Sequence, residues 1–209
     1  MNAHTQRLVL QGPAGAIEAL LDEPAADTVC LGTAVVAHPH PLFGGTMDNK
    51  VVQTLARALV QTGWTSIRFN FRGVGASQGE HDHGVGEARD LMAVIEQLAP
   101  QGPLALAGFS FGAFVTTHAV AALHPEREIR QVVLVGTAAS RFDVAPIPPE
   151  LHDRTLVIHG EADDTVPLSS AMDWARPQGL PILVVPGGSH FFHGQLPQLK
   201  NWVVRHLRA

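Results

Sequence analysis

The feature that most constrains the fold lies in residues 103–115, Pro-Leu-Ala-Leu-Ala-Gly-Phe-Ser-Phe-Gly-Ala-Phe-Val. Leu104 to Ala107 form a short apolar run that predicts a buried strand, and an apolar stretch of helical length begins just after Ser110. Between them lies a G-x-S-x-G sequence, which in this strand–turn–helix setting places the serine on a tight, strained turn. Residues two positions to either side must lack a Cβ, because a side chain there would collide with the turn. The first amides of the helix would face whatever the hydroxyl attacks.

The rest of the chain alternates between strand-like and helix-like segments. Residues 7–10 and 16–21, joined by turn-forming residues, predict an antiparallel edge hairpin. Such an alternation predicts an α/β fold with a mostly parallel sheet of about eight strands and helices on both faces. The expected strands after the hairpin are 29–37, 64–69, 104–107, 132–135, 156–159 and 182–185, and the expected helices are 48–61, 86–99, 111–123, 167–175 and 195–207.

Chemically reactive residues fall in loops that directly follow expected strands. His-Pro-His-Pro at 38–41 follows one strand, and Asp163 and His190 follow the last two. The carboxyl ends of parallel strands form the ligand crevice, so these loops should meet near Ser110. A serine hydroxyl becomes a good nucleophile when a base takes its proton, and the base needs a carboxylate to fix its tautomer. The chain order Ser, Asp, His is the one expected for this type of turn.

The motifs resemble those of the α/β-hydrolase superfamily, and within it the small, lidless esterases similar to dienelactone hydrolase. The resemblance covers nearly the whole chain and rests on residues 38–41, 72–77, 108–112, 159–167 and 188–190. It implies that Ser110 is the nucleophile, His190 the base and Asp163 the acid, with Asp164 and His193 as the alternatives. Dienelactone hydrolases carry a cysteine where this chain has Ser110, which favours ordinary esters over lactones.

The resemblance also implies where the oxyanion would be bound. One donor is the amide of Phe111, directly after the nucleophile. The other comes from the His-Pro-His-Pro loop, where many relatives have His-Gly-x and this chain has Pro39 at the glycine position. His40 is then the matching donor and Leu42 the alternative, because Pro41 has no amide hydrogen. The competing interpretation of the two histidines is a metal site, but no third and fourth ligands are evident.

Segment 137–154 is where relatives with a cap usually insert it. Here it is short and proline-rich, which predicts that the fold has no cap domain and that the active site is an open cleft. An open apolar cleft suits small acyl groups. The side chains expected to line it are Leu42, Phe43, Phe109 and Phe111, with Phe142 and Phe191 as further candidates.

Three further features are expected to have no part in the chemistry. Residues 72–77 resemble the glycine loop that lies beneath the active site in the family, rather than a phosphate cradle. His81, Asp82 and His83 are expected to be solvent-exposed. Cys30 is the single cysteine and has apolar neighbours, which predicts a buried, unreactive thiol and fits a reducing compartment.

Length and charge narrow the class of function. A chain of 209 residues is long enough for one core and is expected to form a single domain over 1–209. A net charge of −5 argues against nucleic acid or an anionic membrane as partner. The N-terminus lacks the pattern of a signal peptide and no apolar run reaches membrane-spanning length, which predicts a cytoplasmic protein.

The expected function is therefore that of a serine hydrolase, a carboxylesterase that acts on small soluble esters without a cofactor or metal. Two alternatives stay open. The same three residues could serve a peptidase, thioesterase or acyltransferase, and the scaffold could be a non-catalytic binding protein. The sequence does not distinguish a monomer from a homodimer.

Overall fold

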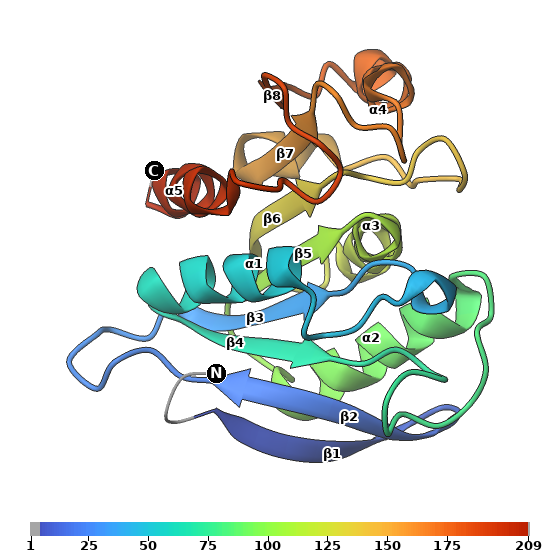
Figure 1. Ribbon diagram of the computed structural model, residues 1–209. Coiled ribbons are helices and arrows are strands. Elements are labelled where there is room, and N and C mark those ends of the chain that lie inside the picture. The colour runs from blue at the N-terminus through green and yellow to red at the C-terminus, as the bar shows by residue number, and fades with distance from the viewer. Residues whose placement is uncertain (1–4, 209) are drawn as a thin grey trace.

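An eight-stranded sheet forms the centre of the computed structural model, which describes residues 5–208 (Figure 1). The strands are β1 (Gln6–Gly12), β2 (Gly15–Asp22), β3 (Gly32–Ala37), β4 (Trp64–Phe69), β5 (Leu104–Phe109), β6 (Ile129–Val135), β7 (Thr155–Gly160) and β8 (Ile182–Val185), arranged in the order β1-β2-β4-β3-β5-β6-β7-β8. The helices are α1 (Lys50–Gln61), α2 (Val85–Leu98), α3 (Phe111–Leu123), α4 (Leu168–Ala175) and α5 (Leu196–Leu207).

The pairing of the strands confirms the predicted sheet. β1 and β2 form the antiparallel hairpin, and β2 also pairs antiparallel with β4. From β4 to β8 every neighbouring pair is parallel. The carboxyl ends of β3, β5, β7 and β8 therefore lie at one edge of the sheet, and the loops that carry the candidate residues begin there.

Helices cover both faces of the sheet, as Figure 1 shows. α1 and α5 pack on one face, where Leu55, Leu59, Leu199 and Val203 join a single buried cluster. α2 and α3 pack on the other face in a second cluster. α3 is buried around most of its circumference because it packs against both the sheet and α2, which explains why its sequence is apolar with little periodicity.

Two expectations about residues 29–37 are wrong. The strand begins only at Gly32, and Val29 is 78% exposed. Gly32 has φ of +146°, and a Cβ there would lie 2.3 Å from the carbonyl oxygen of Pro103, so the chain enters the sheet through a conformation that favours glycine. Cys30 precedes that entry point, where no strand covers it, and it is exposed rather than buried.

The loops at the site edge contain short 3₁₀ turns. After β3, Pro41–Phe43 form one such turn, because proline at its first position already has the required φ. The connection between β6 and β7 contains only the 3₁₀ segment Pro149–Arg154 and no cap domain. Within residues 5–208, every helix is too short or too polar to cross a lipid bilayer.

Candidate active site

Ser110 lies on the turn between β5 and α3 in a strained backbone conformation. Its φ is 56° and its ψ is −116°, a combination that residues with a side chain rarely adopt. A Cβ on Gly108 would lie 2.4 Å from the carbonyl oxygen of Gly112, and a Cβ on Gly112 would lie 2.4 Å from that of Ala37. A side chain at either position would therefore collide with backbone atoms, which cannot move aside. This agrees with the expectation that both positions must be glycine.

Ser110, His190 and Asp163 form a continuous hydrogen-bonded chain. His190 Nε2 is 3.0 Å from Ser110 Oγ, and His190 Nδ1 is 2.7 Å from Asp163 Oδ2. The three residues are 7%, 3% and 7% exposed. Because the carboxylate can only accept, Nδ1 carries the imidazole proton and Nε2 is free to accept the proton of the serine hydroxyl.

The second oxygen of Asp163 is held by backbone amides. Oδ1 accepts hydrogen bonds from the amides of Thr165 at 3.0 Å and Val166 at 2.8 Å. Burial by itself would raise the pKa of Asp163, but the hydrogen bonds from His190 and Val166 outweigh burial, and its pKa lies below the ordinary value. The carboxylate is thus charged at neutral pH.

The two alternative residues do not take part in this chain. Asp164 and His193 are exposed, and within residues 5–208 neither hydrogen-bonds to Ser110 or to His190. Asp164 Oδ1 instead accepts a hydrogen bond from the hydroxyl of its neighbour Thr165, at 3.4 Å. The geometry brings together Ser110, His190 and Asp163.

The loops after β7 and β8 are bonded to each other through their backbones. The amide of Glu161 donates to Val185 and the amide of Ala162 donates to Gly188, both at 2.9 Å. A Cβ on Gly160 would lie 2.2 Å from the oxygen of Gly188, so the two loops approach more closely than side chains allow. This contact fixes the spacing between the segments that carry Asp163 and His190.

Two free amides point to an oxyanion site. Among the described residues, neither the amide of Phe111 nor that of His40 has a hydrogen-bond acceptor in the protein. The alternative donor, the amide of Leu42, is engaged: it donates to His40 Nδ1 at 3.2 Å. The backbone amides of Phe111 and His40 are therefore available to bind an oxyanion, whereas the amide of Leu42 is already hydrogen-bonded.

The two histidines of the His-Pro-His-Pro loop face different partners. His38 is fully buried; its Nε2 accepts from the amide of Phe71 at 3.0 Å, which leaves Nδ1 to donate to the oxygen of Pro39 at 2.6 Å. Burial lowers the pKa of His38 to about 4. Burial, followed by the charge of His81, also lowers the pKa of His40. Residues 5–208 contain no cluster of three or more side chains suited to a metal ion.

A cavity of about 310 Å³ opens over Ser110. Phe43 and Phe191 line it, whereas Leu42 is 67% exposed outside it and Phe109 is fully buried. Phe109 points into the core beneath the site, where its ring lies 4.9 Å from that of His190, so it supports the imidazole rather than a substrate. The complete lining is Pro39, His40, Phe43, Gly44, Gly45, Asn49, Ser110, Arg141, Thr165, His190 and Phe191.

The cavity is more polar than the sequence suggested. Phe111 and Phe142, expected on its wall, do not line it, because their rings pack against each other at 5.2 Å. Asn49, Arg141 and Thr165 line it instead. The sequence feature that could have indicated Arg141 and Thr165 is their position, because both lie in loops that follow strands at the site edge.

The expectation that residues 81–83 are exposed is wrong for His81. Its side chain is only 7% exposed, and its Nδ1 lies 2.7 Å from Oε1 of Glu87, which is fully buried. The ring of His81 also lies 4.8 Å from that of His40. Asp82 and His83 are exposed as expected. The sequence feature that could have predicted the burial of His81 is Glu87, an acidic residue on the buried face of α2.

The glycine loop at 72–77 packs against the sheet. Gly75 has φ of +58°, and a Cβ there would lie 2.6 Å from both Asn70 Nδ2 and Glu18 Oε2. Asn70 and Glu18 are themselves hydrogen-bonded at 2.9 Å. These contacts leave the loop close against β2 and favour its structural role.

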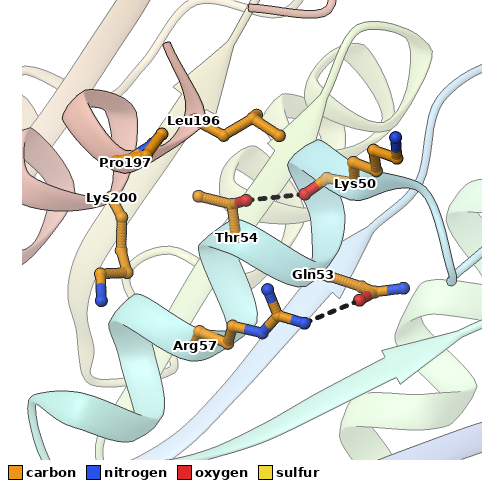
Figure 2. Close-up of a pocket in the computed structure, with 7 residues that line it drawn as sticks. All are labelled: Lys50, Gln53, Thr54, Arg57, Leu196, Pro197 and Lys200. Carbon is orange, nitrogen blue, oxygen red and sulfur yellow. Dashed lines mark hydrogen bonds between the residues drawn. The ribbon is translucent and has the colours of Figure 1, made fainter. Parts of the chain in front are cut away.

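A separate cavity of about 450 Å³ lies between α1 and α5 (Figure 2). Lys50, Arg57 and Lys200 line it, and Figure 2 shows the hydrogen bond from Arg57 to Gln53 along α1. Its lining contains no nucleophile–histidine–carboxylate arrangement, so the cavity over Ser110 is the candidate active site.

Comparison with known proteins gives the same fold. Residues 42–154 match the alpha/beta hydrolase fold family. A crystal structure from Xanthomonas campestris, described as an a/b serine hydrolase without lid, is 39% identical, covers 100% of this chain and 95% of its own, and superimposes with a TM-score of 0.87. An alpha-beta serine hydrolase homologue from Coxiella burnetii is 38% identical, covers 97% of each chain and has a TM-score of 0.81.

A curated relative extends the comparison. An uncharacterized protein from Rickettsia prowazekii is 42% identical over 118 residues, which are 54% of this chain and 49% of the relative. The chain thus matches that curated relative over about half of the relative's length. The family match, the lidless structural relatives and the arrangement around Ser110 agree. The chain belongs to the alpha/beta hydrolase fold family.

Proposed function

We propose that the protein is a serine hydrolase, and specifically a carboxylesterase for small soluble esters. Ser110 is the nucleophile, His190 the general base and acid, and Asp163 the group that orients His190 and stabilises its charged form. The observation that carries the proposal is the pair of hydrogen bonds, 3.0 Å from Ser110 to His190 and 2.7 Å from His190 to Asp163. Geometry of this kind serves acyl transfer.

The reaction proceeds in two halves. Ser110 Oγ attacks the acyl carbon while its proton passes to His190 Nε2, and the carbonyl oxygen becomes an oxyanion bound by the amides of Phe111 and His40. Collapse of this intermediate breaks the ester bond, and the leaving alcohol takes the proton from His190. Water then attacks the acyl-serine, giving its proton to His190, and the acid leaves as Ser110 regains its hydrogen.

The same proposal covers the domain that carries out the reaction, its independence of a cofactor and the cellular compartment. A single domain over residues 1–209 would carry out these steps without a cofactor, since the nucleophile, base and oxyanion donors are all groups of the chain. The single cysteine rules out an internal disulfide, which suits the cytoplasm. The absence of a cap between β6 and β7 leaves a cavity of about 310 Å³ open to small esters.

The test is the hydrolysis of para-nitrophenyl acetate by Ser110→Ala. We expect kcat/KM to fall by roughly three orders of magnitude or more, with an unchanged circular dichroism spectrum. Ser140→Ala, on an exposed loop residue, is the matched control and should retain full activity. A fluorophosphonate should label the wild type and the control but not Ser110→Ala. An active Ser110→Ala protein would refute the assignment.

A further inference from the structure

The cavity over Ser110 carries a single permanent charge. Of the residues that line it, only Arg141 is a lysine, arginine, aspartate or glutamate. Asp163 is buried beneath His190 and does not line the cavity. A substrate in this cavity therefore meets one positive charge and no negative one.

The guanidinium of Arg141 is free to take an external partner. Within residues 5–208, Arg141 makes no ion pair, and its side chain makes no hydrogen bond. Arg68 and Arg72 are instead held by Asp22 and Asp90 at 3.2 Å and 2.8 Å. A guanidinium left unpaired beside a nucleophile differs from the arginines that stabilise the fold.

The backbone of Arg141 is nevertheless well anchored. Its amide donates to Ala138 at 3.2 Å. The next residue, Phe142, stacks on Phe114 of α3 with ring centres 4.7 Å apart and an interplanar angle of 16°. His118, also on α3, bonds the carbonyl oxygen of Asp143 at 2.8 Å. These contacts hold the backbone of Arg141 at the rim of the cavity, which its side chain lines.

We propose that Arg141 makes this site selective for short esters that carry a carboxylate in addition to the ester bond. A guanidinium binds a carboxylate through two parallel charge-assisted hydrogen bonds, and no carboxylate of the cavity wall competes for it. The inference rests on the proposed function, since it names the substrate class of the same site. The carboxylate belongs to either the acyl or the alcohol part of the ester, and both are tested.

The experiment compares charged and neutral esters of matched size. On the acyl side the pair is mono-para-nitrophenyl adipate and para-nitrophenyl hexanoate. On the alcohol side it is 4-acetoxybenzoate and its methyl ester. The measured quantity is the ratio of kcat/KM for the charged ester to that for the neutral ester, in the wild type, Arg141→Gln, Arg141→Lys and the control Arg130→Gln, whose arginine lies at the amino end of β6 and pairs with Glu128.

We expect Arg141→Gln to lower the ratio about ten- to a hundredfold for at least one pair, the range of a lost charge-assisted hydrogen bond. Arg141→Lys should keep a larger part of the preference, and Arg130→Gln should match the wild type. Added salt should reduce the wild-type ratio, because the guanidinium is exposed to solvent.

Two results would overturn the inference in different ways. If the wild type hydrolyses the neutral esters but Arg141→Gln leaves both ratios unchanged, selection by Arg141 is wrong and the esterase proposal stands. If the wild type hydrolyses none of the four esters, the proposed function fails and the inference fails with it.

Discussion

Replacing His38 by glutamine should make the stability of the protein less sensitive to acid. His38 has no exposed surface, and its Nε2 accepts the amide hydrogen of Phe71, so a proton on Nε2 would face another proton. Its pKa falls from 6.5 to about 4 on folding. The unfolded chain then binds the proton more tightly, and the free energy of unfolding drops as pH falls from 6.5 toward 4.

The size of the effect follows from that difference. At ~1.4 kcal/mol per pH unit, protonation of the unfolded chain removes about 2 kcal/mol between about pH 7.5 and about pH 5. Urea unfolding at the two pH values measures the change in wild type and in His38→Gln. Other histidines of lowered pKa, such as His159 and His206, are present in both proteins and cancel in the comparison. Asp163 contributes only at more acidic pH, because its pKa lies below 3.8.

The wild type should therefore lose about 2 kcal/mol more than the variant between the two conditions. Titration of the His38 ring by NMR supplies an independent value of the pKa and needs no variant. Equal losses in the two proteins, or a ring that titrates near 6.5, would refute the reasoning.

Two further substitutions test the site and its surroundings. Asp163→Asn should lower kcat by roughly three to four orders of magnitude, because the charge that orients and stabilises His190 is lost, whereas Asp164→Asn should retain activity within about twofold; esterase assays of both decide the matter, and the reverse order would reassign the acid. Glu87→Gln places an amide NH₂ against backbone N–H groups in the core and should lower the free energy of unfolding by about 1–3 kcal/mol in urea titrations. Glu96→Gln, at an exposed position of α2, should change it little, and equal effects of the two would contradict the argument.

Much of the fold could be predicted because local patterns decide it. The bounds of β4 and β8 match the prediction, since each is a short segment with apolar or β-branched residues that is closed by turn-forming residues. The start of β3 was missed because it depends on the neighbouring chain: Gly32 enters the sheet against Pro103, more than seventy positions away. An apolar run before that entry looks the same in sequence whether or not a strand pairs with it.

The candidate site also has a part that could be predicted from the sequence and a part that could not. Its hydroxyl, imidazole and carboxylate follow strands at one edge of the sheet, so sequence order and topology together placed them near each other. The cavity wall was harder to predict. Phe109 and His81 differ from expectation because burial depends on which way a side chain faces in the assembled molecule. Arg141 belongs to no motif, and only the position of its loop reveals it.

The direct bonding of the β7 and β8 loops has a mechanical consequence. Because backbone bonds join Glu161 and Ala162 to the opposite loop, the carboxylate and the imidazole are tied into one rigid block. The hydroxyl is carried by a different block, the turn after β5. The 2.7 Å contact between His190 and Asp163 lies within the bonded pair of loops, whereas the 3.0 Å contact between Ser110 and His190 joins that pair to the turn after β5. A displacement of this turn relative to the two loops would change the distance across which the proton travels.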